Sequence, residues 1–435
     1  MGTWRRARQA SALSGIAVAA LVLGAALQGV SEPPSAALPG LDPSRIVVMF
    51  DDGVPLDLPN FAAAHSARVE LSLPNLGGAV LQTDDSGALL EALLDRDDVA
   101  AAEVDFALHT SAAPDDPRAS AQWALGSVGL PAAWDRGFGS HAVRIALLDT
   151  GVDLFHEDIA ANVCAARNFV DPPRSPVDDL GHGTHTAGIA VGAANNGVGI
   201  AGASQSCLLL AKVCDAAGDC AVSLTAAGID WALNPDGDAA TQDAAHILSM
   251  SFGSPFHSGT LEQAVQRAWQ AGVLVVASAG NEQCGLVDFP AAYDEVVAVS
   301  ALERAPLASA TGRFGLPSEV RASYASCGPE VELTAPGSDI LSTVPGNRYA
   351  ELSGTSMAAP LVAGIAGLVK ASNPALTNAQ LRCVLDDTAQ DLGAPGRDLE
   401  HGFGKVRADL AVAGAAQGAS CDQPHGILPF FDEDP

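Results

Sequence analysis

The sequence predicts a three-layer α/β domain with a mostly parallel central sheet, preceded by a small α+β unit. Nearly continuous apolar runs recur beyond residue 140, and such runs are typical of strands buried on both faces of a parallel sheet. Helical patterns alternate with these runs, as in βαβ units. Before residue 111 a single helical pattern lies between two short strand-like runs. The polar, proline-containing stretch 111–117 marks the boundary between the two parts.

The chain begins like a secretory signal peptide. Arg5, Arg6 and Arg8 precede an uncharged apolar stretch over 12–27, and small and proline residues follow it. This stretch has 16 residues, whereas a membrane span needs ~20. We therefore expect a signal peptide over 1–30, with an uncleaved anchor as the alternative. The Arg pair is only weak evidence for a twin-arginine route.

The elements of the first part follow in order. A linker rich in Pro, Ser and Ala is expected over 31–44, and a strand over Arg45–Phe50. Four leucines within 89–94 have the spacing of a helix, and another strand is expected near Val99–Phe106. The unit as a whole, 45–111, has only about 65 residues, so its core alone supplies marginal stability.

The second part, 112–415, carries the α/β alternation. Five apolar runs are expected as strands: Ile145–Leu148, Leu208–Ala211, Ile247–Met250, Val273–Ala277 and Val296–Val299. Four helices are expected around them: Thr184–Val191, Leu224–Leu233, Leu261–Ala271 and Met357–Ala371. Residues 416–435 form an acidic C-terminal tail.

Composition excludes several classes of protein and partner. Lys and Arg number 22 and Asp and Glu 51, so the formal net charge is −29; loss of the signal peptide removes three Arg and no acid, which gives −32. This acidity argues against nucleic acid, and against a membrane after signal removal, as a partner. An apolar content of 48% excludes a disordered chain. Eight cysteines in 435 residues indicate a cored protein with some disulfides, consistent with an oxidising compartment.

Three segments place a reactive side chain at the end of a strand or the start of a helix. Asp149 follows the apolar run that begins at Ile145, at the edge where open α/β sheets place their sites. His182 opens one expected helix, and Ser356 opens another, among unpaired backbone N–H groups. Each segment alone has an ordinary interpretation as a turn, a structural histidine or a helix cap. Their occurrence together, in the order Asp, His, Ser, favours a catalytic triad.

With these motifs the chain resembles the subtilisin-like serine proteases (subtilases), whose triad has this known order. The motifs are Asp149-Thr-Gly, His182-Gly-Thr-His185, Ala279-Gly280-Asn281 and Gly354-Thr-Ser356-Met-Ala-Ala-Pro360. The resemblance runs from about Asp116 to about Val412. It implies a subtilisin-like fold for the second part. For 45–111 it implies an inhibitory propeptide with a ferredoxin-like α+β fold.

The resemblance also implies catalytic roles. Ser356 attacks the scissile carbonyl, His182 takes and returns the proton, and Asp149 orients His182 and stabilises its charged form. Asn281 and the backbone N–H of Ser356 stabilise the oxyanion. His185, the second histidine of its motif, is expected to have a packing role.

Substrate-binding residues follow from the same resemblance. Ser251, Phe252 and Gly253 are expected to pair with the substrate backbone as an added strand. The primary pocket is expected to be walled by Ser278, Ala279 and Gly280. Asp288 falls near the expected pocket floor, where it would favour Arg or Lys in the substrate. The alternative is that Asp288 is a surface residue of a loop.

A structural Ca²⁺ ion is a further implication of the resemblance. Side-chain oxygens are expected from Asp116, Asp158 and Asn196. Carbonyl oxygens are expected from Ala194, Val198 and Ile200, and together they suit a shell of 6–8 oxygens. The alternative is a capped turn beside a Gly/Asn-rich loop without metal.

The eight cysteines allow 105 pairings. Cys214 and Cys220 lie six residues apart, which suits a local disulfide. Cys164 and Cys207 lie near the starts of strands that are neighbours in the sheet of the subtilases. A pairing of Cys284 with Cys327 leaves Cys383 with Cys421 by elimination.

The sequence therefore predicts a secreted serine endopeptidase, extracellular or periplasmic, made as an autoprocessed zymogen. Its partners are protein or peptide substrates and its own propeptide, which is cut off between about Leu108 and Asp115. We expect a monomer.

Three alternatives differ in class. One is a catalytically idle subtilase fold that acts as a binding module. Another is a metal hydrolase built on His182 and His185, which lacks the Glu of H-E-x-x-H. An α/β-hydrolase is disfavoured, because Ala358 stands where the G-x-S-x-G elbow needs Gly and because the His precedes the Ser.

Overall fold

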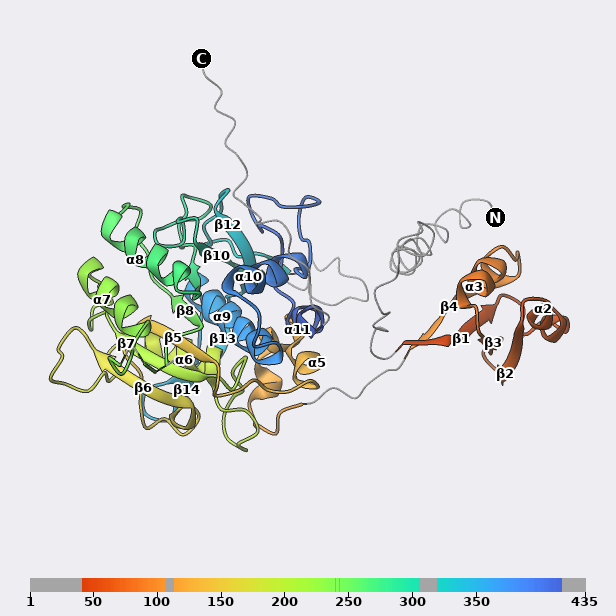
Figure 1. Ribbon diagram of the computed structural model, residues 1–435, viewed down its shortest axis with the longest axis horizontal. Coiled ribbons are helices and arrows are strands. Elements are labelled where there is room, and N and C mark those ends of the chain that lie inside the picture. The colour runs from red at the N-terminus through yellow and green to blue at the C-terminus, as the bar shows by residue number, and fades with distance from the viewer. Residues whose placement is uncertain (1–40, 107–112, 239, 242, 306–318, 417–435) are drawn as a thin grey trace, which may run out of the picture. The chain divides into compact units, whose positions relative to one another are not determined.

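The computed structural model describes residues 41–106, 113–238, 240–241, 243–305 and 319–416 (Figure 1). The chain divides into two compact units, with the division between Thr110 and Ser111. The expected signal peptide, and the expected tail from residue 417 onward, lie outside the described residues.

The first unit is a four-stranded antiparallel sheet with two helices, so the predicted α+β fold is confirmed. Its elements are β1 (Leu41–Phe50), α2 (Leu58–Ala64), β2 (Ala67–Leu73), β3 (Gly78–Thr83), α3 (Ser86–Leu94) and β4 (Val99–Phe106). The strand order is β2-β3-β1-β4, which with this chain order is the ferredoxin-like arrangement. Both helices and the sheet share one core, in which Ile46, Leu81 and Leu89 are fully buried.

Three elements of this unit, α2, β2 and β3, were not predicted. None of the seven residues of β2 is buried, so the strand lacks the alternation that marks a half-buried strand. The structure also begins β1 at Leu41, inside the predicted linker 31–44. Leu41 pairs with Phe106 of β4, and the register shifts between Asp42 and Ile46. The chain therefore enters the sheet four residues before the predicted strand Arg45–Phe50.

The second unit is built on an eight-stranded sheet that is parallel except at β11, which confirms the predicted fold class. Its strands are β5 (Arg144–Asp149), β6 (Val163–Asn168), β7 (Cys207–Lys212), β8 (Ile247–Met250), β9 (Leu274–Ser278), β10 (Val296–Arg304), β11 (Glu319–Arg321) and β12 (Val331–Pro336). They run in the order β11-β10-β9-β8-β5-β7-β6, and β12 pairs with β10. A separate antiparallel hairpin joins β13 (Ile340–Val344) and β14 (Arg348–Leu352).

Helices cover both faces of this sheet and give the three layers seen in Figure 1. They are α4 (Trp123–Ser127), α5 (Leu130–Trp134), α6 (His182–Val191), α7 (Val222–Ala232), α8 (Gly259–Gln270), α9 (Thr355–Ser372), α10 (Asn378–Asp387) and α11 (Ala408–Ala416), with 3₁₀ turns at Ala119–Ala121 and Ala160–Asn162. α6, α9 and α11 pack on one face, and α7 and α8 on the other. β5 contributes side chains to the hydrophobic cores on both faces. Ile145 and Leu147 pack in the core with α6, α9 and α11, and Ala146 and Leu148 pack in the core with α7 and α8. This two-sided burial explains the continuous apolar run in the sequence.

α9 is the central helix of its layer. By length and composition it is the one helix of the described residues that would suit a membrane span, but most of it is buried inside the protein. Its first turn lies over the edge of the sheet at which β5, β8 and β9 end, because these parallel strands all point the same way. That shared edge brings together side chains that are far apart in the sequence.

Candidate active site

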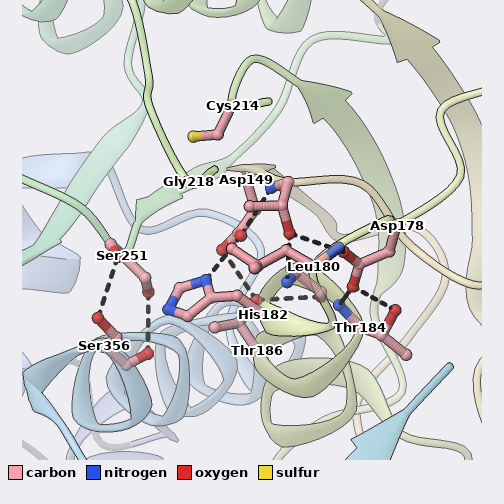
Figure 2. Close-up of polar contacts among 12 residues, drawn as sticks. Asp149, Asp178, Leu180, His182, Thr184, Thr186, Cys214, Gly218, Ser251 and Ser356 are labelled. Atoms are coloured by element: carbon pink, nitrogen blue, oxygen red, sulfur yellow. Dashed lines mark hydrogen bonds and ion pairs between the residues drawn. The ribbon is translucent and has the colours of Figure 1, made fainter. Parts of the chain in front are cut away.

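Asp149 is the last residue of β5, and its side chain is only 1% exposed. Its Oδ1 accepts a hydrogen bond from the backbone N–H of Thr150 at 2.7 Å, and its Oδ2 accepts one from the hydroxyl of Thr186 at 3.1 Å. Both bonds fix the carboxylate in one orientation, with Oδ1 turned toward the start of α6 (Figure 2).

His182 is the first residue of α6 and lies against Asp149. Its Nδ1 is 2.7 Å from Asp149 Oδ1. A carboxylate accepts but does not donate, so Nδ1 carries the proton and Nε2 is free to accept one. Burial lowers the pKa of His182, but the charge of Asp149, its hydrogen bond and the charge of Asp178 outweigh burial, so the net shift is upward.

Ser356 lies in the first turn of α9, across from the imidazole of His182 (Figure 2). Its hydroxyl donates to the carbonyl of Ser251 at 3.0 Å, and the hydroxyl of Ser251 donates back to the carbonyl of Ser356 at 3.0 Å. The described residues form no hydrogen bond between Ser356 and His182. Such bonds are often long or absent in free enzymes, and rotation of the Ser356 side chain is enough to exchange acceptors.

Asn281 faces the same first turn of α9. Its Oδ1 accepts hydrogen bonds from the backbone N–H and the hydroxyl of Thr355, at 3.0 and 3.1 Å. A backbone N–H can only donate, so this contact fixes the orientation of the amide and leaves Nδ2 as a donor on the other side. A Cβ built on Gly354 would lie 3.7 Å from both Asn281 Nδ2 and the backbone nitrogen of Ser356. The amide of Asn281 and the backbone N–H of Ser356 therefore lie on either side of one position next to Ser356.

The predicted substrate-binding segments lie at the ends of β8 and β9. Ser251, Phe252 and Gly253 directly follow β8, and Ser278, Ala279 and Gly280 end or follow β9 and are buried.

Asp288 lies between these two segments. A Cβ on Gly253 would be 2.6 Å from the Asp288 Cβ, and one on Gly280 would be 2.8 Å from Asp288 Oδ2. Burial, followed by the nearby charge of Glu282, raises the pKa of Asp288. A half-buried carboxylate thus lies between the segment predicted to pair with substrate and the segment predicted to wall the pocket.

The residues expected to hold calcium form a hydrogen-bonded cluster. Asp158 is fully buried and accepts hydrogen bonds from the Asn196 amide at 2.8 Å and the Ile200 N–H at 2.7 Å. Buried Asp116 accepts hydrogen bonds from the N–H groups of Asn195 and Asn196 at 2.8 and 3.2 Å.

Burial, and further down the order of causes the charge of Asp116, raises the pKa of Asp158. In the described part of the chain, no hydrogen bond ends on the carbonyls of Ala194, Val198 and Ile200. The candidate ligand atoms of these side chains and carbonyls are all oxygens, so the residues fit a hard cation such as Ca²⁺. A group of three or more His, Cys, Asp or Glu suited to a metal is absent from the described residues.

His185 does not share the environment of His182. It is fully buried, and its Nε2 hydrogen-bonds the carbonyl of Ala350 at 3.1 Å. Burial lowers the pKa of His185 to about 4, so the ring is neutral. The ring of His185 is thus held by the carbonyl of Ala350, whereas the ring of His182 is held by Asp149.

Sequence reasoning missed Asp178 and Lys212, which lie behind the predicted triad residues Asp149 and His182. Asp178 is buried and hydrogen-bonds the start of α6, and Lys212 contacts the carbonyl of Thr150 and pairs with Asp179 at 2.7 Å. The signal was an acidic residue four positions before His182, but two neighbouring acids share it. Only the fold distinguishes which of the two is buried.

Between cysteines that both lie in the described part of the second unit, the structure forms the disulfides Cys164–Cys207, Cys214–Cys220 and Cys284–Cys327. These pairs are among those considered from the sequence. The fourth pairing involves Cys421, which lies outside the described residues, and stays a prediction.

Comparisons with known proteins identify the family of the chain. The model of the subtilase family matches residues 140–404. Subtilisin Savinase of Lederbergia lenta is 40% identical over 294 residues, which cover 67% of this chain and 99% of that protein. An alkaline protease of Shouchella clausii is also 40% identical, over 67% of this chain and 70% of its own length. The halolysin-like extracellular serine protease Nep of Natrialba magadii is 36% identical, over 74% and 56% respectively. The chain therefore belongs to the subtilase family.

Proposed function

We propose that this subtilase hydrolyses peptide bonds with Ser356 as nucleophile, His182 as general base and acid, and Asp149 as the group that orients His182. The family makes the protein a serine-type endopeptidase that acts on proteins or peptides. The observation that carries the residue assignment is the 2.7 Å contact between His182 Nδ1 and buried Asp149, with Ser356 across from the ring.

The chemistry follows from the positions of the protons. Nδ1–H of His182 is held by Asp149, so Nε2 accepts the proton of Ser356 once that hydroxyl leaves the carbonyl of Ser251. The negative oxygen that forms on the substrate is stabilised by Asn281 Nδ2 and the N–H of Ser356. His182 then returns the proton to the leaving amine, and Ser356 is left acylated. A water molecule, deprotonated by His182, attacks this acyl-enzyme and releases the second product and the free Ser356 hydroxyl.

An inhibitor assay tests this function. We expect casein hydrolysis that is blocked by a serine-directed fluorophosphonate and is not promptly lost in EDTA. Prompt loss in EDTA would favour a metal hydrolase, and no hydrolysis would favour an idle binding module. Labelling of Ser356 by the fluorophosphonate identifies the nucleophile, and Ser356→Ala serves as the unlabelled control.

We further propose that the protein is exported and that the unit at 45–111 is an inhibitory propeptide removed by the enzyme itself. The basic and apolar start of the chain supports export, and the named extracellular relative agrees with it. Ser356→Ala is expected to remain full length after signal removal, as judged by mass spectrometry. Normal processing of that variant, with the wild type as control, would instead indicate another protease.

The place of Asp288 supports a preference for Arg or Lys before the cut. Its carboxylate is half-buried between Gly253 and Gly280, where the charge of a basic side chain would compensate its burial. On a panel of peptides, Arg substrates are expected to outperform Phe and Leu substrates, and Asp288→Asn to reverse the order. Phe or Leu substrates that are cleaved faster by the wild type would contradict this assignment.

A structural calcium ion held by Asp116, Asp158 and Asn196 is proposed for the cluster beside 194–200. Two buried carboxylates side by side destabilise each other, and a cation relieves that repulsion. Chelation is expected to lower the melting temperature of the wild type and to have little effect on Asp158→Asn. An unchanged melting temperature of the wild type would remove the site.

A further inference from the structure

Asp178 is a buried carboxylate that accepts five hydrogen bonds. It is 5% exposed. Its Oδ1 accepts from the Thr150 hydroxyl at 2.8 Å and from the N–H groups of Leu180 and Gly181 at 3.1 and 2.7 Å. Its Oδ2 accepts from the N–H and the hydroxyl of Thr184 at 2.8 and 2.7 Å. These five hydrogen bonds satisfy both oxygens of the buried carboxylate, as burial of a polar group requires.

These donors flank Asp149 and His182, the two titratable members of the proposed triad. Thr150 directly follows Asp149, Gly181 directly precedes His182, and Thr184 lies in the same first turn of α6. The Thr150 hydroxyl also accepts from the N–H of Gly183 at 2.9 Å. Together with the Asp149–His182 bond drawn in Figure 2, these contacts close a ring that joins the end of β5 to the start of α6.

We infer that Asp178 is a positioning residue of the triad, which holds the end of β5 and the start of α6 at the separation that the Asp149–His182 hydrogen bond requires. The inference rests on the proposed function. It adds to it a residue that does not touch substrate.

The charge of Asp178 gives this role a signature besides stability. Its negative charge is one of the groups that raise the pKa of His182, together with the charge and hydrogen bond of Asp149 and against the effect of burial. Lys212 and Asp179, which also lie nearby, form an ion pair with each other, so their charges largely cancel. Removal of the Asp178 charge therefore acts on His182, whereas a purely structural residue would leave the titration of His182 unchanged.

The chemistry of the carboxylate decides which substitutions are informative. Every contact of Asp178 is a donor, so the NH₂ group of Asp178→Asn faces N–H or O–H donors in either orientation. Asp178→Asn thus keeps the shape but removes the charge and part of the ring. Thr150→Val removes two of the bonds and keeps the charge. Asp171→Asn is the matched control, because it removes one negative charge from an exposed ion pair with Arg174 in the same connecting segment.

The experiment measures the pH dependence of kcat and KM for mature enzyme on one peptide substrate, with thermal unfolding of each variant. We expect kcat of Asp178→Asn to fall about 10- to 100-fold, the effect of a small misplacement of catalytic groups, with KM nearly unchanged. The acid limb of its profile is expected to move to lower pH. Thr150→Val is expected to lower kcat without moving that limb, and Asp171→Asn to match the wild type.

Two outcomes would overturn the inference. One is a folded Asp178→Asn with wild-type kcat and acid limb. The other is an Asp178→Asn that does not fold, combined with a folded Thr150→Val of wild-type kcat, because the ring would then have no catalytic role. An inactive wild type that fluorophosphonate does not label would contradict the proposed function itself, which is a distinguishable result.

Discussion

At the level of single residues, Asp149 acts through both of its oxygens. Oδ2 is fixed by Thr186, and Oδ1 is shared between the N–H of Thr150 and the imidazole of His182. Because Asp149 is buried, its hydrogen bond to His182 is little screened by water or salt. The orientation of His182 therefore depends on the rigid end of β5.

The raised pKa of His182 predicts how activity depends on pH. The base must be neutral, so kcat/KM is expected to rise with pH to a midpoint above the ordinary histidine value of about 6.5. The same pair stabilises the fold in the opposite sense: its contribution is complete below pH 6.5 and is lost as pH rises through the folded pKa. A pH–rate profile checks the first statement. Asp149→Asn should move the midpoint down, and an unmoved midpoint would contradict the assignment.

Asn281 offers a second test at this scale. Its Oδ1 is occupied by Thr355, so Nδ2 is the donor available to the proposed oxyanion site; Asn281→Ala removes this donor together with the two contacts to Thr355. We expect kcat to fall about 10²- to 10³-fold with little change in KM, since the donor acts mainly in the transition state. That magnitude is known for the corresponding side chain of a subtilisin and is carried over to this chain. A rise in KM alone would show that Asn281 binds substrate instead.

At the level of elements, α6 depends on close contact with the loop after β5. A Cβ added to Gly183 would meet the backbone carbonyl of Gly151, and backbone cannot rotate away. This approach brings the first turn of α6, and with it His182, against Asp149. A glycine in the middle of a helical motif is explained here by packing, because helix propensity alone disfavours it.

Gly183→Ala is therefore expected to destabilise the protein by about 1–3 kcal/mol, as overpacked sites do, although alanine favours helix. The matched control is Gly126→Ala in α4, where the added methyl meets nothing within 4 Å. That control is expected to be neutral or slightly stabilising. Denaturant unfolding of both variants checks the pair. Equal effects would mean that α6 adjusts without cost.

The predicted elements differ from the observed ones for physical reasons. β5, β7 and β8 were found because strands buried on both faces consist almost entirely of apolar residues. β2 was missed because it lies at the edge of its sheet and exposes most of its residues. Short edge strands carry little periodic signal in the sequence. Their pairing partners define them.

At the level of the whole molecule, the disulfides close loops of very different length. Cys164–Cys207 and Cys284–Cys327 each span 43 positions, and Cys214–Cys220 spans six. In the chain-entropy model a cross-link restricts the unfolded chain more when its loop is longer. The long pairs should therefore stabilise the catalytic unit more than the short one.

We expect removal of Cys284–Cys327 by double serine substitution to cost about 4 kcal/mol, and removal of Cys214–Cys220 about 2 kcal/mol. The free energy of unfolding in denaturant, measured in a Ser356→Ala background to prevent self-digestion, checks this order. The same background with all cysteines retained is the reference. An equal or reversed order would show that native-state packing, rather than chain entropy, dominates.

The sequence by itself determined the fold class, the order of the main strands and helices, and the residues proposed as the triad with Asn281. Each of these is encoded locally, by continuous apolar runs and by short motifs at strand ends and helix starts. The tertiary structure alone decided that Asp178 rather than Asp179 is buried behind His182, that the Ser356 hydroxyl rests on the carbonyl of Ser251, and that Asp288 lies between Gly253 and Gly280. These features depend on contacts between segments far apart in the chain, and such contacts exist only when the parallel strands align their carboxyl ends at one edge.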